Sequence, residues 1–177
     1  KSLDNIKLIL NIHNNYHTSI DWDNNCDFEK VKKMNISQIK NCKYIMNGNF
    51  TDDNIQHTNI TKINDEGIIF NFIQLWGYGY YHFICEILPR ILYYIEHQNN
   101  FINKQIIFIL YLNDTFILRF LQLLPQLENV VIIPHHENYI YDIQDRDVYN
   151  ITQTISGNPS QENIQLIRKY YLKNIAP

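Results

Sequence analysis

The chain has 177 residues and a formal net charge of -3, and this length is enough for one domain with a hydrophobic core or for two very small ones. Hydrophobic residues make up 45% and charged residues 19%, with 5 Gly and 5 Pro, which excludes collagen-like, low-complexity and strongly disordered chains. Such a charge gives no basic field to follow a phosphate backbone, so we expect no nucleic-acid partner. No run of about 18 apolar residues occurs, so we expect no membrane span in this chain.

The cysteines and the glycosylation sequons say little about the compartment. The three cysteines have no C-x-x-C spacing, so neither a zinc ribbon nor a dense disulfide framework is predicted. Asn-x-Ser/Thr sequons begin at Asn35, Asn49, Asn59, Asn113 and Asn150. Asparagine and isoleucine are abundant, as in proteins of AT-rich genomes, and this bias creates sequons by chance. The sequence leaves open a secretory lumen or the cytoplasm of such a eukaryote, or the host cytoplasm of a virus.

The N-terminal third predicts short strands and loops. Residues 1–66 are polar and asparagine-rich, with short apolar runs at 6–10, 44–46 and 59–63, and we expect an irregular segment that packs on the main domain. Residues 68–75 form a β-branched and aromatic run bounded by glycines. This run predicts a buried strand.

The next segment changes to helical periodicity. From Tyr80 to about Gln98 the apolar residues recur at helical spacing, at Ile84, Ile87, Leu88, Ile91, Leu92 and Ile95. This stripe predicts an amphipathic helix of about five turns. Pro89 lies inside it and removes a backbone hydrogen bond to the carbonyl of Cys85, so we expect a kink or break there.

Apolar runs and helical patterns then alternate to the end of the chain. Residues 105–112 and 130–133 predict strands buried on both faces, and residues 139–143 predict a shorter strand. Helices are expected over 116–124, capped by the preceding polar residues, and over 163–171, capped by Ser160.

This alternation predicts the α/β class, with a Rossmann-like, mostly parallel sheet flanked by helices. The core is expected over residues 67–156. Residues 157–177 are expected to be a helix that leads toward a further domain.

The turn and the helix start after residue 75 carry the strongest candidate site. Gly77 and Gly79 lie between a buried strand and a helix, at the carboxyl end of the strand, where α/β folds place their sites. His82, Glu86 and Arg90 follow at i, i+4 and i+8, opposite the apolar stripe. His82 can take a proton from a hydroxyl, Glu86 can orient it, and Arg90 can pair with Glu86 or with an anionic ligand. The same pattern also fits a solvated, charged helix face, and the spacing leaves both interpretations open.

Other patterns give weaker candidates. His135, His136 and Glu137 follow a predicted strand and predict either a ligand-binding His135 or a solvated loop, with no further ligand at zinc spacing. Tyr78, Tyr80 and Tyr81 are candidates for stacking on sugar faces. The glycines do not complete a G-x-G-x-x-G motif, and no P-loop or G-x-S-x-G motif occurs, so we expect neither a bound cofactor nor a metal ion.

The segment from Tyr80 to Ile91 resembles the hallmark motif of glycosyltransferase family 61. The matching positions are His82, Glu86, Pro89 and Arg90. A looser similarity extends over about residues 67 to 173, whereas residues 1–66 match nothing in the family.

The resemblance implies an inverting, sugar-nucleotide-dependent transferase of the two-domain GT-B type. The family's C-terminal features are absent, so this chain would be the N-terminal, acceptor-side half and a poor catalyst by itself. The implied partners are a sugar nucleotide, a glycan or glycoprotein acceptor, and a missing C-terminal domain.

In that role His82 and Glu86 are the candidate catalytic residues, and Tyr80, Tyr81, Arg90 and His135 are candidates for substrate binding. Arg90 would also organise its helix. A carbohydrate- or protein-binding module without turnover, and a small metal-dependent hydrolase using His135 and His136, remain as alternatives.

Overall fold

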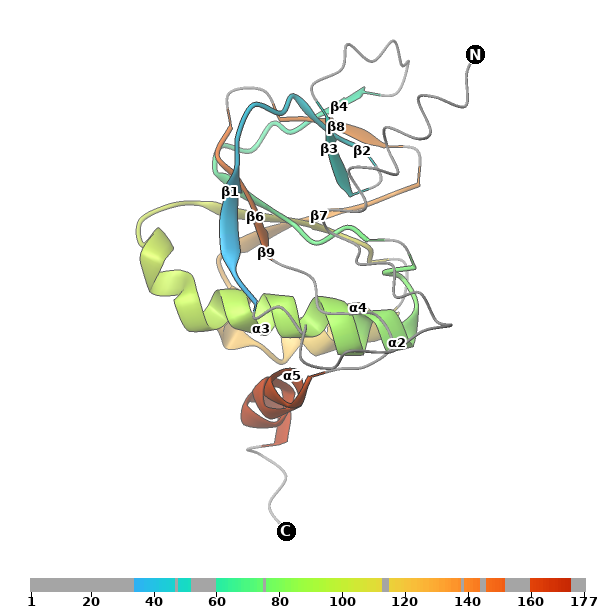
Figure 1. The fold of residues 1–177 in the computed structure, drawn as a ribbon, viewed down its shortest axis with the longest axis vertical. Coiled ribbons are helices and arrows are strands. Elements are labelled where there is room, and N and C mark those ends of the chain that lie inside the picture. Colours follow the sequence, from blue (N-terminus) through green and yellow to red (C-terminus); the bar gives the residue numbers. More distant parts are fainter. Residues whose placement is uncertain are drawn as a thin grey trace, which may run out of the picture.

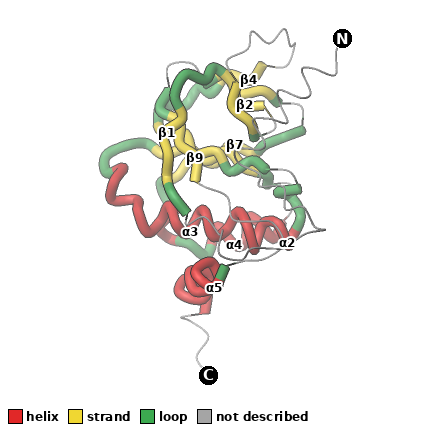
Figure 2. Tube along the Cα trace, in the orientation of Figure 1, coloured by secondary structure: helices red, strands yellow, loops and turns green. Residues whose placement is uncertain are grey.

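The computed structural model describes residues 34–46, 48–51, 60–74, 76–112, 115–137, 139–143, 146–151 and 160–172. The run predicted as a strand at 6–10 and the capping residues at 113 and 114 lie outside these ranges. The described residues form three stacked layers, with helices below the larger sheet and a smaller sheet above it in Figure 1. Figure 2 shows the same separation of helices from strands.

The central layer is a five-stranded sheet with the strand order β1-β9-β5-β6-β7. Its strands are β1 (Ile36–Ile39), β5 (Ile68–Asn71), β6 (Ile106–Leu110), β7 (Val130–Pro134) and β9 (Val148–Ile151). Strands β9, β5, β6 and β7 run parallel to their neighbours, and β1 is antiparallel to β9. The carboxyl ends of four strands therefore meet at one edge of the sheet.

The second sheet has four short strands in the order β3-β2-β8-β4. They are β2 (Tyr44–Met46), β3 (Asn49–Thr51), β4 (Ile60–Lys62) and β8 (Ile140–Asp142). Strand β2 is antiparallel to β3 and β8, and β4 is parallel to β8. The N-terminal third thus contributes three strands to the smaller sheet and one to the larger one.

The helical layer consists of the helices that follow β5 and β6 in the sequence and of a helix near the C-terminus. Its α-helices are α2 (Tyr80–His82), α3 (Leu88–His97), α4 (Thr115–Gln122) and α5 (Gln161–Ile167). A π-helical turn over Phe83–Ile87 joins α2 to α3, and another over Arg168–Leu172 extends α5. Short 3₁₀ turns cover Gln98–Phe101 and Pro125–Leu127. The Ser160 hydroxyl accepts a hydrogen bond from the Asn163 N–H at 3.2 Å, which confirms the predicted cap of α5.

Alternation along β6 explains why its sequence is apolar throughout. Ile106, Phe108 and Leu110 belong to the core on the helix side, whereas Ile107 and Ile109 belong to the core on the side of the smaller sheet. Because both faces of the strand are covered, side chains of both parities are buried. The prediction of a strand buried on both faces is confirmed.

The predicted long helix is present, and near Pro89, where a kink or break is expected, a π-helical turn interrupts the α-helical pattern just before the proline. The Leu88 N–H donates to the Phe83 carbonyl, five residues back, and Pro89 occupies the first turn of α3. A proline is tolerated at that position because the first turn of a helix lacks partners for its N–H groups. The π-helical turn therefore joins α2 directly to α3, with no loop between them.

The predicted α/β class is confirmed by this arrangement. Both sheets are mixed, and a second sheet, instead of helices, covers the face of the larger sheet opposite α3 and α4. Strand β9 was not among the predicted elements. None of the helices in the described ranges is long and apolar enough to cross a membrane.

Candidate functional site

The site begins where β5 ends and the chain turns into α2. The Gly77 N–H donates to the Gln74 carbonyl at 3.0 Å, and the Gly79 N–H donates to the Trp76 carbonyl at 2.8 Å. A Cβ added at Gly77 would lie 2.8 Å from Ile87 Cδ1. A side chain there would displace the Ile87 side chain, so the turn lies close against the π-helical segment. This packing sets the helix start beside the carboxyl ends of the strands.

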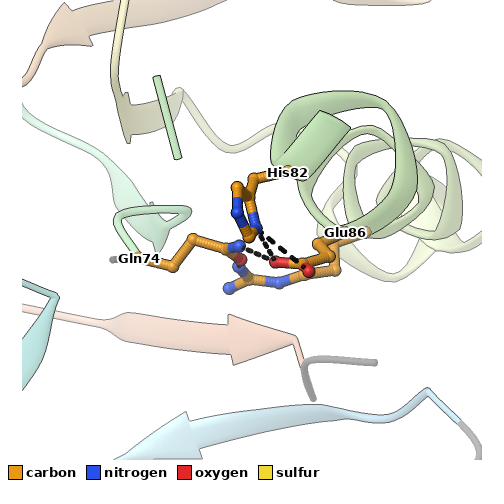
Figure 3. Close-up of polar contacts among 4 residues, drawn as sticks. Gln74, His82 and Glu86 are labelled. Carbon is orange, nitrogen blue, oxygen red and sulfur yellow. Dashed lines mark hydrogen bonds and ion pairs between the residues drawn. The ribbon is translucent and has the colours of Figure 1, made fainter. Parts of the chain in front are cut away.

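His82 and Glu86 form a hydrogen-bonded pair at this edge. His82 Nδ1 lies 3.1 Å from both carboxylate oxygens of Glu86, as Figure 3 shows. A carboxylate accepts hydrogen bonds, so in the neutral ring the proton sits on Nδ1 and the Nε2 lone pair is left free. The His82 side chain is 24% exposed, whereas that of Glu86 is 2% exposed. The buried carboxylate therefore orients an imidazole that reaches solvent.

Gln74 connects this pair to Arg90. Its side-chain amide donates to Glu86 Oε2, and its Oε1 accepts a hydrogen bond from Arg90 Nη1 at 3.3 Å. Figure 3 shows Gln74 reaching the carboxylate from the strand side, while His82 reaches it from the helix. A neutral amide thus bridges a buried cation and a buried carboxylate, and both ends of the amide are used.

Arg90 ties α3 to the ends of β5 and β9. Its Nη2 donates to the Asn71 carbonyl at 2.9 Å and to Asn150 Oδ1 at 3.0 Å, and its Nε donates to the Ile151 carbonyl at 3.1 Å. The guanidinium also lies over the ring of Phe72, 5.2 Å from its centroid. Arg90 is buried, and these hydrogen bonds join α3 to the strand ends.

Burial lowers the pKa of Arg90 to about 10, and the nearby Glu86 carboxylate opposes this shift. The guanidinium therefore remains charged at neutral pH. The spacing of His82, Glu86 and Arg90 also fits a solvated, charged helix face. That alternative is wrong for Glu86 and Arg90, because both are buried.

Exposed aromatic rings lie on the segment around His82, and two of them contact its ring. Trp76 is 55% exposed, and Tyr78, Tyr80 and Tyr81 are exposed as well. The rings of Trp76 and Tyr81 each lie 5.6 Å from the His82 ring, centroid to centroid. Tyr80 contacts Phe116 of α4. The predicted stacking residues Tyr80 and Tyr81 are therefore accessible, and Tyr81 lies beside the candidate base.

His135 lies at the same edge, after β7, but in a different environment. It is fully buried, its ring is 4.7 Å from that of Tyr111, and its Nδ1 lies 3.1 Å from the Tyr141 hydroxyl. The solvated loop considered for 135–137 is wrong at His135, although His136 and Glu137 are exposed. Burial, followed by the charge of His136, lowers the pKa of His135 to about 4.

The sequence analysis did not identify three residues of this hydrogen-bond network. Gln74, Asn71 and Asn150 lie at strand ends and complete the network through side chains and carbonyls. Their common signal is a buried polar residue in or directly after an apolar strand, and such residues require hydrogen-bond partners.

Within the described residues, no group of three or more His, Cys, Asp or Glu side chains is arranged to hold a metal ion. The chain matches no protein-family model, no curated protein and no solved structure in the comparisons made. The resemblance to glycosyltransferase family 61 therefore rests on the sequence motif alone.

Proposed function

We propose that this chain is the acceptor-side domain of an inverting, sugar-nucleotide-dependent glycosyltransferase. In this proposal the α/β core is the Rossmann-like N-terminal half of a GT-B architecture, and a further domain supplies the nucleotide site. The observation that carries the proposal is the His82–Glu86 pair, whose spacing matches the family motif and whose Nδ1–carboxylate contact prepares Nε2 as a base.

The proposed step is a single displacement. The acceptor hydroxyl oxygen attacks the anomeric carbon of the donor, the bond from that carbon to the nucleoside diphosphate breaks, and the hydroxyl proton moves to His82 Nε2. Glu86 stabilises the imidazolium that forms, because its carboxylate accepts from Nδ1. Stabilisation of the diphosphate leaving group would come from the further domain.

Gln74 and Arg90 support this step through Glu86. Gln74 donates to the carboxylate and is itself held by Arg90. Arg90 is in turn fixed by acceptors at the ends of β5 and β9. Both are positioning residues, because they act on the base through another side chain.

A transfer assay on the protein that carries this chain tests the proposal, with a panel of sugar nucleotides and release of nucleoside diphosphate as the readout. We expect His82→Gln to lower kcat by about 10²-fold or more, as general-base catalysis requires. His97→Gln is the matched control, since His97 lies on α3 and its Nδ1 contacts the Tyr93 carbonyl at 2.8 Å. Unchanged transfer by His82→Gln would remove this histidine from the mechanism.

A binding module without turnover is favoured by one observation, the exposed rings around His82. Such rings can stack on a sugar whether or not a base follows. Glycan binding by the protein without transfer from any donor in the panel would establish this alternative.

A further inference from the structure

Trp76 combines two features that do not stabilise a fold. Its φ of 58° places a non-glycine residue in the left-handed region, which L-amino acids with a side chain disfavour. More than half of its surface is exposed, so this large indole contributes little burial here. An exposed residue held in an unfavourable conformation is evidence for a functional role.

The position of the indole ring suggests which role this is. The ring contacts the imidazole of His82, and no described residue hydrogen-bonds to His82 Nε2. The backbone turn that fixes Trp76 is held by the hydrogen bond from the Gly79 N–H to the Trp76 carbonyl. A flat apolar surface is therefore fixed next to a free proton acceptor.

The charges near this ring favour a neutral ligand. Residues 75–89 contain no Lys or Arg, and Arg90 is buried with four hydrogen bonds to protein groups. A diphosphate is held most strongly by accessible cations, and this segment supplies none. A sugar ring needs an aromatic face for its C–H groups and polar partners for its hydroxyls.

We propose that Trp76 is the stacking platform for a neutral acceptor sugar and holds the reacting hydroxyl of that sugar beside Nε2 of His82. This inference rests on the proposed function and adds to it the residue that binds the acceptor. Tyr81, the second exposed ring beside the imidazole, borders the same position. The diphosphate of the donor is not bound by these residues.

The test measures sugar binding by the full chain. The chain has two tryptophans, so Trp22→Phe leaves Trp76 as the only indole, and its fluorescence reports binding. The probes are maltohexaose, cellohexaose, xylohexaose and chitohexaose at millimolar concentration, with UDP as the nucleotide probe. Affinities are measured by calorimetry on the chain with both tryptophans and on its variants.

We expect at least one oligosaccharide to change the Trp76 fluorescence, and UDP to leave it unchanged. Trp76→Asn removes the ring but keeps a residue that tolerates a positive φ, and it should weaken binding of that oligosaccharide by about tenfold or more. Trp76→Phe keeps a ring and should bind within about threefold of the original affinity. Tyr139→Ala, at an exposed ring that contacts His136 instead of His82, is the matched control and should bind normally.

Equal affinity of Trp76→Asn and the unmodified chain would overturn the platform. Binding of none of the oligosaccharides, or a response of Trp76 to UDP instead, would overturn it as well. Transfer and sugar binding are measured separately, which separates this inference from the proposed function: His82→Gln should lose transfer, and Trp76→Asn should lose sugar binding. Transfer that depends on His82 but not on Trp76 would contradict only the platform. Sugar binding that depends on Trp76, without transfer, would contradict only the enzyme.

Discussion

Two histidines lie at the carboxyl edge of the same sheet, and their surroundings give them opposite properties. His82 reaches solvent, and its Nδ1 is held by a buried carboxylate that is itself supported by Gln74. His135 is fully buried between tyrosines, and its Nδ1 lies against the Tyr141 hydroxyl. Within the part of the chain that the structure describes, its Nε2 has no hydrogen-bond partner.

The difference shows which of the two histidines suits the proposed role of a base. A carboxylate on Nδ1 stabilises the protonated ring, whereas a neutral hydroxyl provides no opposite charge. Exposure lets a ligand reach the second nitrogen, whereas burial excludes it and penalises the charged form. Position at the sheet edge therefore does not by itself suit a histidine to act as a base. The partner of Nδ1 and the exposure of the ring distinguish His82 from His135.

The largest expected effect comes from replacing Arg90, which holds Gln74 and, through it, the Glu86 carboxylate beside His82. Arg90→Met should lower the free energy of unfolding by about 3–5 kcal/mol, because it leaves the acceptors of Arg90 and the Glu86 carboxylate buried without their cation. Urea unfolding measures the change. Arg90→Lys keeps the charge but cannot make the same four hydrogen bonds, so its loss should be intermediate.

Arg119→Met is the matched control for this prediction. Arg119 lies on α4 and is exposed, so its replacement should leave the urea midpoint unchanged. An equal loss in both variants, or no loss in Arg90→Met, would contradict the role assigned to the buried network.

The second prediction concerns the His135 side and pH. The pKa of His135 is lowered from 6.5 to about 4, so between these values the unfolded chain binds a proton that the folded chain does not. Stability from this group is complete above about pH 6.5 and is lost as the pH falls toward 4, with a slope of up to about 1.4 kcal/mol per pH unit. His135→Gln should remove that contribution to the slope, as measured by urea unfolding at several pH values.

Tyr141→Phe tests the cause of the shift. Burial is the main cause, so this variant should be less stable at every pH but should keep the slope between pH 4 and 6.5. Loss of the slope in Tyr141→Phe would instead assign the effect to the hydroxyl group.

The third and smallest expected effect concerns the turn that places His82. A methyl group at Gly77 would meet Ile87 Cδ1 at 2.8 Å and Tyr111 Cδ2 at 3.1 Å, and Gly77→Ala should cost about 1–3 kcal/mol. Gly79→Ala is the paired control, because its nearest contact is 3.3 Å and its φ is -75°. A melting temperature that is lower for Gly79→Ala than for Gly77→Ala would contradict this packing.

The sequence predicted the elements of the site but not their orientation. The apolar stripe located the long helix, and the spacing brought His82, Glu86 and Arg90 together. An ideal α-helix would turn these three away from the stripe, but the π-helical turn over Phe83–Ile87 takes more residues per turn and shifts the phase of the residues before it. Periodicity does not detect this insertion, so the burial of Glu86 was not predicted. Arg90 lies after the turn, and its burial depends on partners from distant strands.

The partners of Arg90 could not be predicted for another reason. Asn150 and Ile151 lie 60 and 61 residues away along the chain, and strand β9 that carries them is four residues long. Its neighbours in the sheet, β1 and β5, come from distant segments. Local propensity cannot specify such pairings, because tertiary contacts decide them.

The burial of Asn150 has a practical consequence for anyone who expresses this protein in a glycosylating host. Asn150 begins a sequon, yet its side chain is buried, accepts a hydrogen bond from Arg90, and belongs to a strand paired on both sides. A glycan attached there during synthesis would keep β9 out of the sheet. The customary Asn→Gln replacement would damage the same network. The sequon is better removed at its third residue, by Thr152→Ala, which leaves the Asn150 amide in place.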